Sequence, residues 1–317
     1  MQHKLFLIFF FIFHFSLFTF HSVFAQSRLY VRGSAVPGGI QQLTRFSTST
    51  SGKYTFKFHG KLLPGNLYIT PTNSATPSTY YAPKLVDTNI VTNKADYVQK
   101  RDSVGSEWAV LFEADNYRFT VDITNKQLTG ELFTRWYEAW ICGGCVEDEQ
   151  GKDISGQEGH WQISSGKQME QSWDDPNVFE WTGLLKAYSY NQEPKRFKIN
   201  GQYGWGPKVL HPFTQDASIL TASQVWYNGS EDYKWSIKND GFYRIKINVF
   251  EETIEGEYLG TELPDGIKEL DNWTNGQSDN CEIVKSSNCQ IFNLSGQRLN
   301  KPQRGLNIIG GKKVVIK

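Results

Sequence analysis

The sequence predicts an all-β protein with two tandem immunoglobulin-like β-sandwiches and a small C-terminal β segment. Three observations lead to this fold class: short stretches alternate apolar and polar residues, Gly, Pro and Asn turns separate them, and no amphipathic helix is evident beyond the first 25 residues. A period of two places one set of side chains against a second sheet. Short strands with frequent turns are typical of sandwiches of about 100 residues.

The chain repeats itself, which indicates two copies of one module. Each matched piece reads as a strand: 29–33 with 139–143, 56–62 with 179–185, Trp108 with Trp235, 117–121 with 243–247, and 128–132 with 254–258. In the fourth pair Tyr117, Phe119 and Val121 alternate with Arg118 and Thr120, so the polar set should face outward. We place module 1 at 27–134 and module 2 at 135–260.

The N-terminus predicts an export signal. A short positive start precedes an apolar run from Leu5 to Phe20, and Val23 and Ala25 suit the −3 and −1 positions of a cleavage site. The run is about 16 residues, shorter than the roughly 20 that span a bilayer. We expect residues 1–25 to be removed. No cysteine lies near the cut, so no N-terminal lipid is expected.

The C-terminal region differs in composition from the modules. Residues 261–280 are polar and turn-rich and predict a linker. Residues 281–317 predict three short strands, with tight turns at Ser295-Gly296 and Gly310-Gly311. This segment is too small to hold a stable core alone.

Charge and motifs argue against several function classes. Lys plus Arg equals Asp plus Glu, 33 against 33, whereas a nucleic-acid binder should carry a basic surplus. No nucleophile elbow, Walker loop or His-Glu-x-x-His is present. The adjacent carboxylates at 174–175 and 251–252 fit turns better than the facing pair of a glycosidase. The sequence therefore predicts a non-enzyme with no cofactor and no metal.

Four cysteines follow the signal, namely Cys142, Cys145, Cys281 and Cys289. Three disulfide connectivities are open, and the local pairs 142 with 145 and 281 with 289 are our expectation. The Cys142-Gly-Gly-Cys145 spacing lacks the βαβ setting of a redox site. The second pair is too widely spaced for a four-cysteine zinc site.

Three residues of module 2 predict a glycan site: Trp161, Lys198 and Trp205. Module 1 has Ile40, Tyr68 and Tyr81 instead, and Tyr68 and Tyr81 would be weaker equivalents. A pyranose ring presents a C–H face that packs on an aromatic ring, and an ammonium group donates to its hydroxyls. The alternative is that both Trp are loop anchors and Lys198 is a solvated strand residue.

These motifs resemble the SusE/SusF family of Bacteroidetes starch-binding surface proteins. The resemblance rests on the Trp-Ile-Cys-Gly opening and on segments 178–183, 197–199, 204–207 and 235–258. It implies sandwich modules that hold starch without hydrolysing it, with sites that pair two aromatics and a basic residue, as Trp161, Lys198 and Trp205 do. Module 1 departs at all three positions, so weak binding or a spacer role is expected there.

The resemblance also implies a location and partners. Family members are typically lipoproteins, whereas this chain has no lipid-acceptor cysteine, and residues 291–317 resemble a type IX secretion sorting domain. We therefore expect an extracellular or outer-membrane surface protein that binds polysaccharide, with starch or another α-glucan favoured, beside other outer-membrane glycan-uptake proteins. The competing reading is a secreted protein-binding or adhesin sandwich.

Overall fold

The computed structural model describes residues 27–263 except 49–52, 102–104, 147–165, 188–192, 205 and 230, together with the strands of the tail. The predicted signal peptide and linker lie outside the described residues, apart from 261–263. The described residues contain no helix that is long and apolar enough to cross a membrane. The described residues up to Glu262 form one compact unit, and those from Leu263 onward belong to a second.

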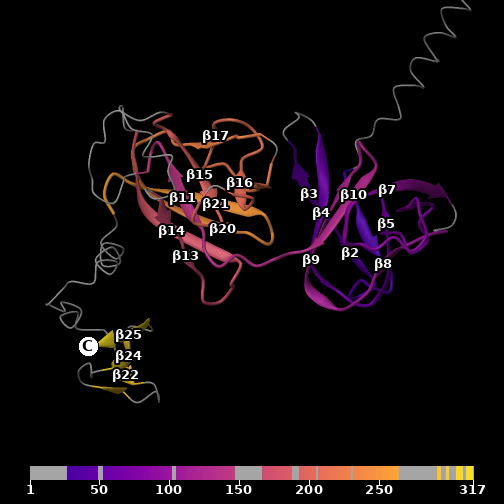
Figure 1. Cartoon of the computed structure of the whole chain (residues 1–317), viewed down its shortest axis with the longest axis horizontal. Helices are drawn as coiled ribbons and strands as arrows, with labels where there is room; N and C mark the ends of the chain where they lie inside the picture. Colours follow the sequence, from indigo (N-terminus) through magenta and orange to yellow (C-terminus); the bar gives the residue numbers. More distant parts are fainter. Residues whose placement is uncertain are drawn as a thin grey trace, which may run out of the picture. The chain divides into compact units, whose positions relative to one another are not determined.

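Module 1 is drawn in indigo to magenta in Figure 1, and its described residues contain ten strands. They are β1 (Tyr30–Arg32), β2 (Ile40–Gln42), β3 (Thr44–Ser47), β4 (Tyr54–Leu62), β5 (Gly65–Thr70), β6 (Thr79–Pro83), β7 (Thr92–Arg101), β8 (Trp108–Val110), β9 (Ala114–Asp122) and β10 (Gln127–Leu132). Their order is β2-β1-β5-β6-β7-β10-β9-β4-β3, with β8 paired to β5.

Strand β7 joins the two layers of module 1. Its first half, residues 92–96, pairs with β10, and its second half, 97–101, pairs with β6. Side chains from both layers meet in one apolar core, which includes Phe56, Ile69, Trp108 and Phe119.

The described residues of module 2 contain eleven strands in two sheets. They are β11 (Trp140–Gly143), β12 (Lys167–Gln168), β13 (Glu170–Gln171), β14 (Val178–Leu185), β15 (Arg196–Asn200), β16 (Val209–His211), β17 (Ala217–Ser218), β18 (Trp226–Tyr227), β19 (Trp235–Ser236), β20 (Gly241–Asn248) and β21 (Thr253–Gly260). One sheet runs β12-β11-β15-β16-β18, with β19 on β15 and β17, and the other β13-β14-β20-β21. A second apolar core includes Ile141, Phe197, Trp235 and Ile245.

The all-β class is confirmed, and every matched piece of the repeat contains a strand. The repeat extends to hydrogen bonds that sequence alone does not show. The hydroxyl of Tyr117 donates to the carbonyl of Phe112 at 2.8 Å, and that of Tyr243 donates to Asn239 at 2.7 Å. Such a bond from a strand tyrosine to backbone a few residues upstream is a known feature of immunoglobulin-like sandwiches.

The turns of the β9–β10 and β20–β21 hairpins are stabilised by matching hydrogen bonds. Asp122 Oδ1 accepts from the backbone N–H groups two and three residues further along the chain, and Asn248 Oδ1 does the same in module 2. Each turn ends in a left-handed residue, Lys126 at φ 54° and Glu252 at φ 57°. The side chain of Asp or Asn stabilises such turns by binding backbone two residues on.

Arg118 corrects one expectation of the strand pattern. It lies on the polar face of β9, yet it is buried, and Lys57 on neighbouring β4 is buried too. The guanidinium of Arg118 donates to the carbonyl of Val249 and lies over the ring of Tyr227, both in module 2. Module 2 therefore covers part of the outer face of module 1.

Among the described residues the tail has four strands, one more than the three predicted. They are β22 (Ile291–Asn293), β23 (Arg298–Leu299), β24 (Gly305–Ile309) and β25 (Lys312–Ile316), in the order β23-β22-β24-β25. The first predicted strand is divided into the β22–β23 hairpin.

Candidate functional site

The outer face of the β11–β15–β16 sheet carries the candidate site. Ile141 pairs with Ile199, and Ile199 with Leu210, and all three side chains are in the core. Because side chains alternate along a strand, Cys142, Lys198, Asn200, Val209 and His211 belong to the opposite face.

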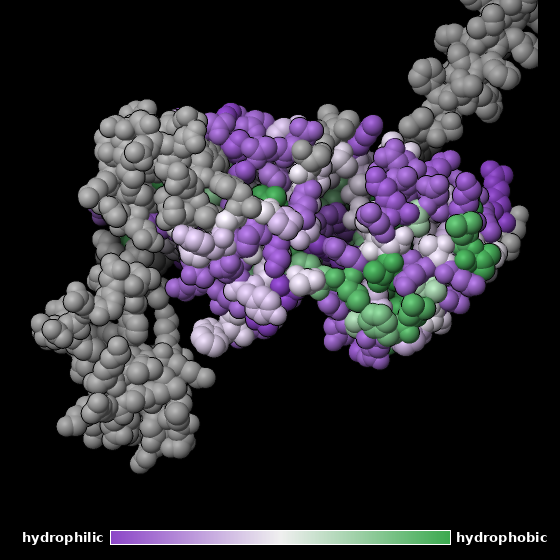
Figure 2. All heavy atoms as spheres, viewed as in Figure 1, coloured by the Kyte–Doolittle hydropathy of each residue, from purple (hydrophilic) through white to green (hydrophobic). Residues whose placement is uncertain are grey.

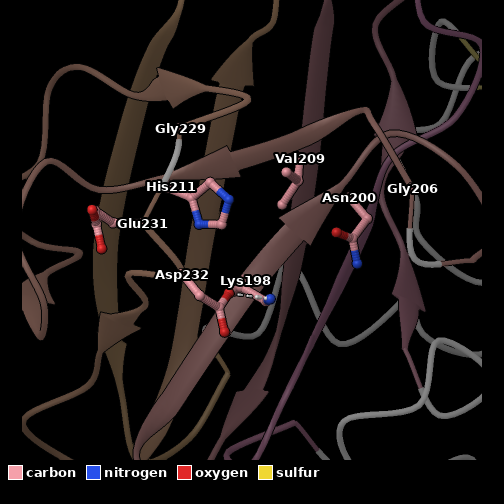
Figure 3. Close-up of a pocket in the computed structure, with 8 residues that line it drawn as sticks. All are labelled: Lys198, Asn200, Gly206, Val209, His211, Gly229, Glu231 and Asp232. Carbon is pink, nitrogen blue, oxygen red and sulfur yellow. Dashed lines mark hydrogen bonds and ion pairs between the residues drawn. The ribbon is translucent and has the colours of Figure 1, made fainter.

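A hollow of about 200 Å³ lies on this face (Figure 3). The sheet supplies Lys198, Asn200, Val209 and His211, and loops supply Gly206, Gly229, Glu231 and Asp232. This volume is below the roughly 300–1,000 Å³ of pockets that enclose a small molecule, so the hollow suits one part of a longer ligand.

Lys198 is tied to the loop beside it. Its Nζ atom lies 2.6 Å from Oδ1 of Asp232, and Nζ of Lys234 lies 3.1 Å from Oδ2 (Figure 3 draws the first contact). Burial alone would raise the pKa of Asp232, but hydrogen bonds from the two ammonium groups outweigh it and hold that pKa below its usual value. Asp232 is therefore ionised at neutral pH and fixes the lysine beside the hollow.

Asn200 and His211 add hydrogen-bond acceptors. The Oδ1 atom of Asn200 is buried and has no hydrogen-bond partner within the part of the chain that the structure describes. Nδ1 of His211 lies 2.9 Å from the Tyr233 carbonyl, which only accepts, so this nitrogen carries the proton. Burial, and then the charge of Lys198, lowers the pKa of His211, so the ring is neutral at pH 7 and Nε2 is an acceptor.

The loop that carries Trp205 is pinned next to the hollow. Gln202 donates to the carbonyl of Gly204 at 3.1 Å and accepts from the N–H of Lys208 at 3.1 Å. Glu138 accepts from the N–H of Tyr203 at 2.8 Å. The Tyr203 ring meets Trp140, the register partner of Asn200, edge-on at 5.1 Å between centroids.

The predicted trio is only partly described. Lys198 lines the hollow, and so does Gly206, the direct neighbour of Trp205. Trp161 and Trp205 themselves lie outside the described residues. Residues that sequence reasoning missed are Asn200, His211, Asp232, Trp140 and Tyr203. The i, i+2 spacing of Lys198 and Asn200 could have indicated Asn200. Asp232 and Tyr203 lie in loops, where no such spacing indicates them.

In module 1 the register supports one predicted correspondence. Tyr68 pairs with Arg32 as Lys198 pairs with Cys142, so Tyr68 occupies the place of Lys198. Tyr81 pairs with Ile69, packs against the core and meets the ring of Tyr97 at 5.5 Å. The structure therefore does not bring Tyr68 and Tyr81 together.

The aromatic ring that lies beside Tyr68 is that of Tyr80 on β6. The rings of Tyr68 and Tyr80 are both half-buried and lie 5.6 Å apart at an interplanar angle of 53°. Since Tyr80 precedes Tyr81, it lies on the opposite face of β6 and shares the outer face with Tyr68.

The cysteine prediction is corrected for the described pair. Cys142 and Cys145 are both free and buried. Cys142 Sγ accepts from Asn200 Nδ2 on the outer face, whereas Cys145 belongs to the core and its thiol contacts the Arg196 carbonyl. The two thiols thus occupy different sides of the sheet. Cys281 and Cys289 lie outside the described residues.

Metal binding finds no support among the described residues, where no group of three or more His, Cys, Asp or Glu is placed to hold an ion. The hollow instead offers one cationic donor and several acceptors beside aromatic rings. That combination suits a ligand with many hydroxyl groups and an apolar ring face.

No protein-family model matches the chain, and no curated protein matches it. A solved structure of SusF from Bacteroides thetaiotaomicron is similar to it, with a TM-score of 0.31 and 13% sequence identity. The match covers 74% of this chain and 48% of that one, so the chain spans about half the length of that protein. This is a distant structural relationship.

Proposed function

We propose that this chain is an exported, non-catalytic glycan-binding protein that holds a neutral glucan, starch or a related α-glucan, at the hollow of module 2. The observation that carries this proposal is that one hollow is lined both by the cationic donor Lys198 and by Asn200, whose buried Oδ1 accepts no hydrogen bond from the described residues. A sugar hydroxyl both donates and accepts, so it matches a site that places a donor beside an acceptor.

Charge supports a neutral ligand. The hollow is lined by one cation, Lys198, and two carboxylates, Glu231 and Asp232, while His211 is neutral at pH 7. A uronic acid would meet this surplus of negative charge, whereas a neutral hexose would not. An unpartnered buried acceptor costs roughly 1–3 kcal/mol, so a ligand hydroxyl that donates to Asn200 Oδ1 gains from satisfying it.

Aromatic stacking supplies the second part of the proposal. Trp161 and Trp205 are the proposed platforms, and Trp140, the register partner of Asn200, would add to them together with the adjoining ring of Tyr203. Each stack should contribute roughly 0.5–1.5 kcal/mol beyond buried area, as aromatic pairs do. Tyr68 and Tyr80 would provide a weaker surface on module 1, because an aromatic pair is present without the lysine.

The state of Asp232 favours binding over hydrolysis. A glycosidase needs a carboxylic acid whose pKa is raised so that it can protonate the leaving oxygen. Hydrogen bonds from Lys198 and Lys234 instead lower the pKa of Asp232. We propose that this carboxylate positions Lys198.

We propose a cellular setting from the composition of two segments. Residues 1–25 would direct export, and the tail that resembles a sorting domain would lead to release or to surface attachment. Weak single sites act in numbers, so the partners would be a polysaccharide chain and other outer-membrane glycan-uptake proteins.

Affinity electrophoresis of the mature protein tests the proposal. Native gels contain amylose, pullulan, dextran, xylan or polygalacturonate, and W205A runs beside the wild type with the exposed control L220A. Retardation by an α-glucan that W205A abolishes and L220A retains is the expected result. No retardation in any polysaccharide would overturn the glycan function.

A protein-binding role is the second candidate, and module 1 carries the observation that favours it. Leu85, Val86, Leu111 and Phe112 are exposed, and Figure 2 shows hydrophobic residues gathered on this module. Their loops are neighbours, since Ala109 N–H donates to the Thr88 carbonyl and Ile90 N–H to that of Ala109. Apolar surface of this kind marks protein interfaces in other proteins. A protein partner lost in L85S/L111S, together with no glycan binding, would favour this candidate.

A further inference from the structure

Module 2 exposes two large aromatic side chains away from the hollow. Trp173, in the loop between β13 and β14, is 93% exposed, and Tyr137, just before β11, is 77% exposed. Neither lines the hollow. Trp173 extends from the β13-β14-β20-β21 sheet, whereas the hollow lies on the β11–β15–β16 sheet.

The loop that presents Trp173 is held in one conformation by its own hydrogen bonds. Ser172 N–H donates to the Val178 carbonyl at 2.8 Å, and Asn177 N–H donates to Asp175 Oδ1 at 2.8 Å. The Ser172 hydroxyl oxygen accepts from the N–H groups of Asp174 and Asp175. An indole on an ordered turn has little backbone entropy left to lose on binding.

Gln171 joins this loop to the segment that carries Tyr137. Its Nε2 donates to the carbonyls of Pro176, at 2.7 Å, and Trp136, at 3.3 Å. Its Oε1 accepts from Arg135 Nη2 at 3.2 Å, and the Arg135 guanidinium lies 5.6 Å from the Tyr137 ring centre. Trp136, between the two, is fully buried and fixes the segment to the core.

We infer that Trp173 and Tyr137, flanked by Arg135 and Asp174, form a second glycan-binding surface on module 2, a platform for the neutral polysaccharide already proposed for the hollow. This inference rests on the proposed function. Aromatic faces between a cationic donor and a carboxylate match the C–H face and hydroxyl rim of a sugar. The immediate neighbours of Trp173 are the polar Ser172 and Asp174, whereas the core of a protein interface is apolar and depleted in charge.

The second surface would act on long chains and not on short ones. A polysaccharide that touches both surfaces binds the second one intramolecularly, so the two weak contacts reinforce each other. A short oligosaccharide fills the hollow alone. Removal of the Trp173 ring should therefore weaken polysaccharide binding about 3- to 10-fold and leave oligosaccharide binding at the hollow unchanged.

The experiment compares wild type, W173A, W173F and the control F112A, which removes an exposed aromatic ring from module 1. Affinity electrophoresis in amylose or pullulan gives the apparent affinity for the long chain, and calorimetry with maltoheptaose gives that of the hollow. Thermal melts verify folding, and none should shift because both side chains are exposed. We expect retardation to be weakened in W173A alone and mostly kept in W173F, and the maltoheptaose affinity to be equal in all four proteins.

Two results would overturn the inference and differ in what else they affect. If wild type and W173A are retarded equally by every polysaccharide, the second surface does not exist and the hollow remains the binding site. If wild type is not retarded by any polysaccharide, the proposed function and this surface fall together.

Discussion

The Nζ atom of Lys57 in module 1 lies 2.6 Å from both carboxylate oxygens of Glu252 in module 2. Lys57 is 9% exposed and Glu252 2%. Glu252 also lies 3.1 Å from Nε2 of His59, whose ring meets Phe250 edge-on. The tip of the β20–β21 hairpin thus fits against the outer face of β4 and fixes the spacing of the two modules.

Removal of the Glu252 carboxylate should destabilise the protein by about 3–5 kcal/mol, because Lys57 would be left buried without its counter-charge. Urea unfolding of E252A measures this, and E251A, which changes the exposed neighbour, should stay within about 0.5 kcal/mol of wild type. The double variant K57M/E252M should recover most of the loss, since it leaves no charge unpaired. An E252A variant as stable as wild type would show that the ion pair between Lys57 and Glu252 does not stabilise the protein.

Stability should fall as the pH is lowered below neutrality. Burial lowers the pKa of His59 and His211 below 6.5, so the unfolded chain binds protons that the folded chain resists, and stability is lost below pH 6.5. Burial raises the pKa of Glu252, but Lys57 and then His59 outweigh it and lower that pKa to about 2. Its contribution is present above its ordinary pKa of 4.5 and is lost as the pH falls toward 2.

Urea unfolding at several pH values gives the measurement, with H59Q as the test variant. Wild type should lose stability from pH 6.5 downward in two stages, and H59Q should show a smaller first stage. A free energy of unfolding that rises between pH 6.5 and 5 would contradict the buried, neutral state of these histidines.

Much of this fold could be predicted from sequence because the repeat and the period of two are local signals. The matched segments contain β1, β4, β9 and β10 and their counterparts in module 2. The turns at Asp122 and Asn248 connect β9 to β10 and β20 to β21. The prediction that polar residues face water was wrong for Arg118 and Lys57, which are buried. Their faces are covered by the other module, which is a tertiary contact that strand periodicity does not encode.

The site was predictable to a smaller extent. Lys198 lies on the face that alternation assigns to it, and Asn200 follows it at the same spacing. Asp232 reaches Lys198 from 34 residues away through a loop, so no local pattern indicated the ion pair. The sequence correspondence predicts Tyr81, whereas the ring beside Tyr68 is that of Tyr80, because a shift of one residue reverses the face of a strand.

Lys198 should be needed for binding and replaceable only by another cation. K198A should weaken binding of maltoheptaose at least about tenfold, since a charged hydrogen bond is lost, while K198R should keep part of the affinity. Calorimetry gives both values, and K246A, which removes an exposed lysine from the other sheet, is the control. Full affinity in K198A would exclude the lysine from the site.

The thiols of Cys142 and Cys145 should be inert in the folded protein. Burial raises the pKa of Cys142 to about 12 and also raises that of Cys145, so neither forms a thiolate near neutral pH. Mass spectrometry after iodoacetamide treatment should find both unmodified in buffer and both alkylated in urea. A disulfide between them, or fast labelling of the folded protein, would show that this part of module 2 is arranged differently.

An NMR titration of the ¹⁵N-labelled mature protein with maltoheptaose tests glucan binding at the hollow most directly. Amide signals of residues 198–211 and 229–232 should shift, with the indole N–H signal of Trp205 among those that change most. Unshifted signals throughout these segments at saturating oligosaccharide would contradict the claim that the module 2 hollow binds a glucan.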